Sequence, residues 1–128
     1  MSAPAVCAVL CLLVVAAGCG QSEERAVRRT LDDFAQATAR KDYQRLCDDL
    51  FAQRLVEEVR RTVPCEVALR NSSLNDARNP KLTVRRITVD GNRATAVVAT
   101  SAANQRPSED TVELVKEREQ WRILALAS

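Results

Sequence analysis

The stretch LTVRRITVDGNRATAVVAT, residues 82–100, decides the fold. Two runs rich in β-branched residues flank Asp90-Gly91, and this dipeptide favours a tight hairpin turn because Gly accepts φ > 0. Two more strand-like runs follow, over residues 111–116 and 121–127. We therefore expect a curved antiparallel meander in the last third of the chain. Helices in the preceding part must cover one face of it, so the expected fold class is α+β.

The apolar alternation changes parity inside the first of these strands. Leu82 and Val84 share one parity, whereas Ile87 and Val89 share the other. A β-bulge at Arg85-Arg86 would keep all four apolar side chains on one face and bend the strand.

The next run differs, because residues 94–99 are apolar on both faces. Such a pattern is typical of a central strand. The polar residues 102–110, which include Pro107, are expected to form a loop.

Before the sheet, the apolar spacing is helical. A first helix is expected to start with Ser22 as its N-cap and to carry one apolar stripe. Asp42 can cap a second helix, with an interruption near residues 50–53 and an end at Pro64. One short helical turn over 65–69 and a turn-rich connector over 71–80 would lead into the sheet. The stripe of the first helix consists of Val27, Leu31, Phe34, Ala35 and Thr38.

The composition bounds the size and the partners. A chain of 128 residues has room for one domain, expected over residues 23–128. Its 19 basic and 17 acidic residues are well mixed, which argues against a nucleic-acid-binding surface. We expect no nucleic-acid partner.

The N-terminal residues have the pattern expected of an export signal. Residues 5–17 form an unbroken apolar run, shorter than the roughly 20 residues of a membrane-spanning helix but typical of a secretory signal. The following VAAGC, residues 15–19, resembles the lipobox of bacterial lipoproteins. Ala16 stands where Leu is commonest in that motif, and no Lys or Arg precedes the run.

The lipobox resemblance implies cleavage before Cys19, whose sulfur would carry a diacylglycerol. Residues 1–18 would then be a signal peptide and residues 19–22 a short tether. The expected location is the extracytoplasmic face of the cell membrane, with Cys19 as the anchor. A plain secretory signal, cut near Ala17 or Gly18, is the alternative.

Two cysteines, Cys47 and Cys65, remain after this boundary. In an exported domain the default for such a pair is one disulfide. A zinc site would need more ligands than two thiols, and the chain contains no His. We therefore expect a Cys47–Cys65 disulfide and no metal or cofactor.

The order of helices, connector and meander resembles the nuclear-transport-factor-2-like (NTF2-like, cystatin-like) cone fold, and within it a group of small actinobacterial lipoproteins. The segments that carry the resemblance are Ala39–Tyr43 before Leu46-Cys47, Cys65 ahead of Ala68-Leu69, Ile87–Ala94 and Trp121–Ile123. The resemblance implies a sheet wrapped around the first helix, with a conical pocket that some members use for ligands or catalysis.

Catalysis in similar enzymes, such as ketosteroid isomerases and scytalone dehydratases, depends on Asp, Tyr or His in an apolar pocket. This chain has no His, its single Tyr43 lies at a helix start, and Asp32-Asp33 lie on the polar side of the first helix. We therefore expect no catalytic residues and no enzymatic activity. The expected function is a lipid-anchored envelope protein with a binding or interaction domain. A pocket enzyme of the isomerase or dehydratase kind and a carrier of a small apolar ligand are the alternatives.

Overall fold

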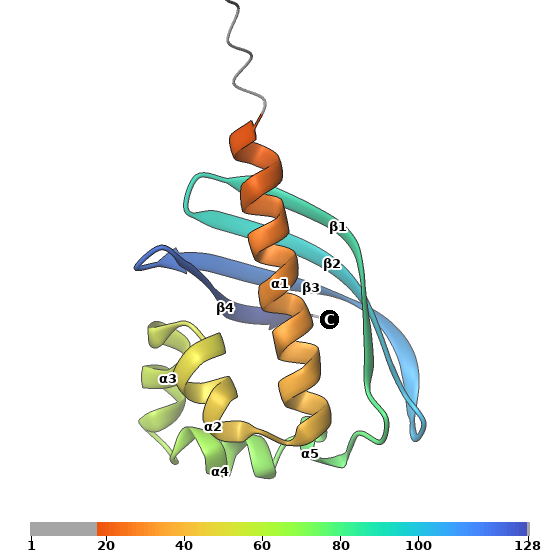
Figure 1. The fold of residues 1–128 in the computed structure, drawn as a ribbon. Coiled ribbons are helices and arrows are strands. Elements are labelled where there is room, and N and C mark those ends of the chain that lie inside the picture. Colours follow the sequence, from red (N-terminus) through yellow and green to blue (C-terminus); the bar gives the residue numbers. More distant parts are fainter. Residues whose placement is uncertain (1–17, 128) are drawn as a thin grey trace, which may run out of the picture.

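A long helix crosses one face of a curved sheet, and a group of short helices closes the end where that helix finishes (Figure 1). The computed structural model describes residues 18–127, with side chains from residue 20 onward. The helical elements are α1 (Gly18–Arg40), α2 (Tyr43–Arg45), the π-helical turn η1 (Leu46–Leu50), α3 (Gln53–Arg60), α4 (Cys65–Arg70) and α5 (Ser73–Asp76). The strands are β1 (Lys81–Asp90), β2 (Arg93–Ala102), β3 (Gln105–Glu117) and β4 (Gln120–Ala127).

The sheet is an antiparallel meander in the order β1-β2-β3-β4. The expected hairpin joins the edge strand β1 to β2, where Asp90 pairs with Arg93 and Gly91 takes a φ of 58° in the two-residue loop. The α+β class and the helix-on-curved-sheet architecture predicted from the sequence are confirmed.

The β-bulge predicted in β1 is also confirmed. Val84 pairs with Val98, but the next paired residue is Arg86, opposite Val97, so Arg85 is the extra residue. Leu82 and Ile87 both pack against the core despite their different parity. The bulge therefore performs the two tasks expected of it, a bend and a common apolar face.

The loop predicted over residues 102–110 is wrong. The loop is short, and β3 already begins at Gln105 and pairs with β2 through Thr100↔Ser108 and Ala99↔Glu109. Pro107 is tolerated because β3 pairs with β4 only from Thr111 onward, so this part of β3 is an edge where a missing N–H breaks no ladder.

The start predicted for the first helix is wrong as well. Helix α1 begins at Gly18, so residues 19–22 form its first turns and Ser22 is not an N-cap. Gln21 and Ser22 are compatible with a helix. The next residue, Glu23, accepts hydrogen bonds from Lys116 and Trp121 of the sheet. Among the described residues, no helix is both long and apolar enough to cross a membrane.

The helical layer follows the sequence closely. Asp42 caps α2 by accepting a hydrogen bond from the backbone N–H of Arg45 at 3.1 Å. The expected interruption lies at Phe51-Ala52, which are extended and join the sheet edge through a bond from the Ala52 N–H to the Ile123 carbonyl at 2.7 Å. Pro64 directly precedes α4.

One core lies between α1, the short helices and the concave face of the sheet. Its fully buried large side chains are Val27, Leu31, Leu46, Val98, Val112, Leu114 and Ile123. Aliphatic side chains dominate it, with Phe34, Phe51 and Trp121 as the buried aromatic ones.

Candidate functional site

A cavity of about 320 Å³ opens beside the C-terminal half of α1. Helix α5 and the start of β1 form one wall, and the concave face of the sheet forms the other. Its apolar lining includes Phe34, Leu74, Leu82, Val98, Val112 and Leu126. Cavities of this size and lining are typical of small-molecule sites.

Charged groups in the described lining are few. Lys81 and Arg106 line the cavity and are exposed, whereas Asp110 is half-buried. Asp110 is the one carboxylate in this lining. Asp110 is the cross-strand partner of Val98 on β2 and lies two residues before Val112 on β3. Its side chain is therefore on the concave face of the sheet.

Asp110 forms a cluster of three oxygen atoms with two hydroxyl groups. Its Oδ2 lies 2.8 Å from Thr100 Oγ1 and 2.8 Å from Ser108 Oγ, and the two hydroxyl oxygens are 2.9 Å apart. We call Thr100, Ser108 and Asp110 the acceptor cluster. Two hydroxyl hydrogens cannot serve all three contacts while the carboxylate is ionised, so the cluster has spare capacity to accept a hydrogen bond.

A second unused polar group lies in the cavity wall. Thr38, on α1, lines the cavity and is 7% exposed, and its Oγ1 has no hydrogen-bond partner among the described residues. Leaving a buried hydroxyl without a partner costs about 1–3 kcal/mol. A native fold that keeps such a group calls for an explanation.

Hydrogen bonds close the cavity at the end of the β2–β3 hairpin. Asn104 accepts from the Arg78 N–H and donates to the Asp76 carbonyl, each at 2.8 Å. The Ala103 N–H donates to the Arg78 carbonyl at 2.8 Å, and Gln105 Nε2 donates to the Ser73 carbonyl at 3.1 Å. These contacts fix α5 and the following segment over the hairpin at this end of the cavity.

The opposite end of α1 is fixed by a different set of contacts. Glu23 accepts from Lys116 Nζ and from Trp121 Nε1, each at 2.7 Å. The Lys116 hydrogen bond, followed by that of Trp121, lowers the pKa of Glu23 below its ordinary value of 4.5. The same bond to Glu23 raises the pKa of Lys116. We call Glu23, Lys116 and Trp121 the staple.

The residues weighed for catalysis lie outside the cavity. The Tyr43 hydroxyl donates to Asn75 Oδ1, which ties α2 to α5, and Tyr43 is not in the described cavity lining. Asp32 is exposed, and Asp33 pairs with Arg45 at 3.1 Å between α1 and α2. The structure therefore gives these three residues structural or solvent contacts.

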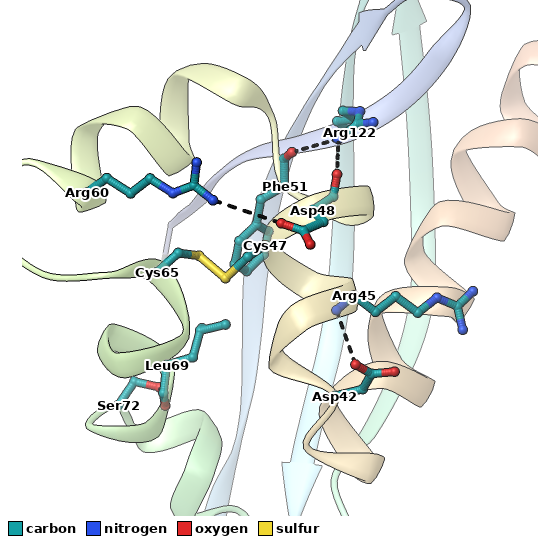
Figure 2. Close-up of a disulfide and its surroundings, with 10 residues drawn as sticks. All are labelled: Asp42, Arg45, Cys47, Asp48, Phe51, Arg60, Cys65, Leu69, Ser72 and Arg122. Carbon is teal, nitrogen blue, oxygen red and sulfur yellow. Dashed lines mark hydrogen bonds and ion pairs between the residues drawn. A yellow bond between two sulfur atoms is a disulfide. The ribbon is translucent and has the colours of Figure 1, made fainter.

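The disulfide predicted from the sequence is present. Figure 2 shows Cys47, on η1, bonded to Cys65 at the start of α4, with Cα atoms 6.1 Å apart. Both cysteines are buried. The bond joins the helical turn that touches the sheet to the segment after Pro64, as the sequence order suggested.

A second hollow, of about 340 Å³, lies beside the disulfide, and several of its polar groups already have partners. Arg122 Nη1 donates to the Asp48 carbonyl at 2.8 Å, and Arg60 lies 3.9 Å from the Asp48 carboxylate (Figure 2). The Glu117 carboxylate accepts from the Gln53 N–H. Contacts between its own side chains and backbone thus occupy much of the polar lining of this hollow, and the cavity beside α1, with its apolar lining, is the better candidate site.

The structure describes only part of the predicted signal and lipidation segment. Residues 1–17 of the expected signal peptide lie outside the described residues, as does the side chain of Cys19. Within residues 18–127, no group of three or more His, Cys, Asp or Glu side chains is placed to hold a metal ion.

The sequence reasoning missed the acceptor cluster because it assigned residues 102–110 to a loop. The parity signal was available, since Ser108, Asp110, Val112 and Leu114 alternate as one face of a strand. The unpaired state of Thr38 had no sequence signal, because Thr38 completes the apolar stripe of α1.

Comparisons with known proteins support the fold. The sequence matches no protein-family model and no curated protein sequence. In three dimensions it is similar to NTF2-like proteins of unknown function from Shewanella baltica (TM-score 0.61, 16% identity, 83% of this chain and 91% of that one) and Silicibacter pomeroyi (TM-score 0.59, 14% identity, 83% and 93%). A SEC-C motif containing protein from Rhodopseudomonas palustris is also similar (TM-score 0.55, 14% identity, 82% and 87%). The chain thus has the NTF2-like fold predicted for it.

Proposed function

We propose that this protein is a lipid-anchored protein of the cell envelope whose NTF2-like domain binds a small molecule in the cavity beside α1, without catalysing a reaction. The observation that carries the proposal is the cavity of about 320 Å³, with an apolar lining and an acceptor cluster that has spare capacity. An interaction module with a filled cone would need neither feature.

Binding is tested with octanol as the probe and the purified full chain as the target. Its apolar chain suits the lining, and methyl NMR signals of Val98 and Leu126, which line the cavity, report on it locally. We expect saturable shifts of both signals. Ala77→Phe, which fills the cavity from its wall, should abolish them, whereas Ala39→Phe, on the exposed side of α1, should not. Absence of saturable shifts in the wild type would overturn the proposal.

The rival function is a pocket enzyme, and Asp110 is the observation that favours it. A carboxylate in an apolar cavity can act as a general base next to a carbonyl group. Such chemistry also needs a donor for the developing oxyanion. The phenol of Tyr43 is bonded to Asn75 instead, and this arrangement supports the binding function over catalysis.

The two functions are separated by hydrogen exchange. The full chain is incubated in D₂O with methyl heptyl ketone, and deuterium at the carbons next to the carbonyl is measured by mass spectrometry. We expect the buffer rate, unchanged by Asp110→Asn. Exchange at about a hundredfold over buffer, lost in that variant, would favour the enzyme.

The anchor is tested by membrane fractionation. The lipobox-like residues 15–19 support it, and Cys19→Ser should move the protein from the membrane fraction to the soluble or secreted fraction. Cys11→Ser, inside the apolar run, is the matched control and should fractionate as wild type. A membrane-bound Cys19→Ser protein would contradict the anchor.

A further inference from the structure

Three polar side chains of the cavity lining are gathered on one part of the sheet. Thr100, Ser108 and Asp110 come from adjacent positions on β2 and β3, because Thr100 pairs with Ser108 and Val98 pairs with Asp110. Thr38 belongs to the α1 wall of the same cavity. A molecule in the cavity therefore meets oxygen atoms on the sheet side and apolar groups over most of the remaining wall.

Hydrogen counting shows which kind of group the cluster lacks. Three oxygen atoms lie within 2.8–2.9 Å of one another, and the two hydroxyl groups supply one hydrogen each. An ionised Asp110 therefore leaves one of the three contacts without a hydrogen. A ligand with an N–H or O–H group can donate to the free lone pairs of the cluster, whereas a ligand with acceptor atoms alone finds no hydrogen there that is not already used.

Thr38 is a further polar residue of the cavity wall. It has no partner among the described residues although it is more than nine-tenths buried. An apolar residue such as Val would fit a helix at this place without an unmet hydrogen bond. Thr38 Oγ1 is itself covered by surrounding atoms, so the acceptor cluster carries the inference about the head group.

We infer that the cavity selects amphipathic molecules by a hydrogen-bond-donating head group, which Asp110 accepts, while the apolar body lies against Phe34, Leu82 and Val98. This inference rests on the proposed binding function. Hydroxyl and ammonium groups share the donor chemistry. The exposed Lys81 and Arg106 in the cavity lining are positively charged and disfavour a cation, so a hydroxyl head group fits better than an ammonium group.

Four probes with straight chains of similar length test the inference on the full chain: octanol, octylamine, octanoate and methyl octyl ether. The ether has the octyl chain of octanol, with a methyl group in place of the hydroxyl hydrogen, and so has no donor. We expect octanol to bind about tenfold more tightly than the ether, judged from titrations of the Val98 and Leu126 methyl signals, since a hydrogen bond to a charged acceptor commonly has an effect of that size. Octylamine separates the cationic donor from the neutral one.

Asp110→Asn should reduce the octanol-to-ether preference to about one and improve the binding of octanoate relative to octanol, because the amide presents a donor where the carboxylate presented an acceptor. Glu109→Gln is the matched control. It makes the same chemical change one residue earlier on β3, at an exposed position outside the described lining, and should preserve the preference.

Ser108→Ala provides a second route if Asp110→Asn does not fold. It removes one of the hydroxyl groups bonded to Asp110 from an exposed position, and it should increase the preference for octanol over the ether several-fold. Equal binding of octanol and the ether by the wild type, or a preference that survives Asp110→Asn, would overturn the inference and leave the binding function intact. Failure of all four probes to shift the Val98 signal would overturn both.

Discussion

The two ends of α1 pack on the same sheet, but they differ in whether a buried threonine hydroxyl has a hydrogen-bond partner. Thr30, midway along α1, bonds toward the staple end: it is 9% exposed, and its hydroxyl contacts the Ala26 carbonyl at 3.3 Å and the carbonyl of Trp121, a staple residue, at 3.1 Å. Near the C-terminal end, Thr38 is 7% exposed and has no partner among the described residues. Equal burial therefore goes with full pairing at one end and none at the other.

This difference separates polar groups whose hydrogen bonds stabilise the fold from polar groups that do not use all of their hydrogen-bonding capacity within it. At the first end Thr30 supplements the staple of Glu23, Lys116 and Trp121, and the hydrogen bonds from these residues join the helix to the β3–β4 hairpin. At the second end the acceptor cluster and Thr38 belong to the lining of a cavity, although Thr38 Oγ1 itself is buried. A buried polar group with a partner contributes to stability, and one without a partner costs stability unless a bound molecule completes it.

The largest effect on stability is expected from removing the Cys47–Cys65 disulfide. Replacing both cysteines, Cys47→Ala with Cys65→Ala, should lower stability by about 3 kcal/mol, because the bond closes a loop over a sequence separation of 18 residues. Thermal unfolding should show a clearly lower Tm, and reductant should bring the wild type to that value without affecting the variant. Reductant sensitivity of the double variant, or free thiols in the native protein, would contradict this.

The next effect concerns the paired end and depends on pH. Glu23→Gln removes the charge that Lys116 and Trp121 stabilise, so it should lower the Tm at neutral pH. Because the folded pKa of Glu23 is below 4.5, its contribution is present above that pH and is lost as the pH falls below it. The contribution linked to the raised pKa of Lys116 is lost only as the pH rises above 10.5.

The control for the staple is Glu24→Gln. Glu24 is exposed and lies 4.0 Å from Arg28 on the same helix, a pair expected to contribute little. Its Tm should match the wild type from acidic to neutral pH. A Glu23→Gln deficit that persists unchanged at pH 3 would show that packing, not charge, fixes this end.

The sharpest test of the comparison is a matched pair of Thr→Val changes on α1. Thr30→Val removes a paired hydroxyl and should destabilise by about 1 kcal/mol, whereas Thr38→Val removes an unpaired one and should stabilise by a similar amount. Chemical denaturation of the ligand-free protein measures both. Changes of the same sign would mean that the two ends do not differ in the way described.

The smallest effect is expected at Tyr43. Tyr43→Phe removes a half-buried hydrogen bond between α2 and α5, which should cost about 0.5–1 kcal/mol. Octanol binding, and any activity the protein has, should change less than a few-fold, because Tyr43 lies outside the described cavity lining. A hundredfold loss of either would make Tyr43 a site residue.

The sequence was sufficient for features that depend on local chemistry. The parity change around Arg85 predicted the bulge, Asp90-Gly91 predicted the hairpin, and Cys47 and Cys65 predicted the disulfide. Each of these depends on a few neighbouring residues, or on a pair with no competitor after the expected export boundary. For this reason the α+β class could be predicted correctly.

The site could be predicted only in part. Strand parity places Asp110 and Thr100 on the concave face once β3 is known to start at Gln105, but Pro107 favoured a loop in the sequence. The approach of Thr100 to Ser108 depends on the irregular register at Thr100/Ala102, which no local pattern encodes. The unpaired hydroxyl of Thr38 depends on packing between α1 and distant segments.

The bulge at Arg85 has a consequence for length changes in this strand. Without that residue, β1 would read LTVRITV, and its four apolar side chains would alternate strictly onto one face. Burial of the strand therefore does not require Arg85, and what the added residue supplies is curvature. In evolutionary terms, one codon here acts as a shape element: its loss would leave the core composition intact while straightening the wall that carries Leu82 beside the cavity.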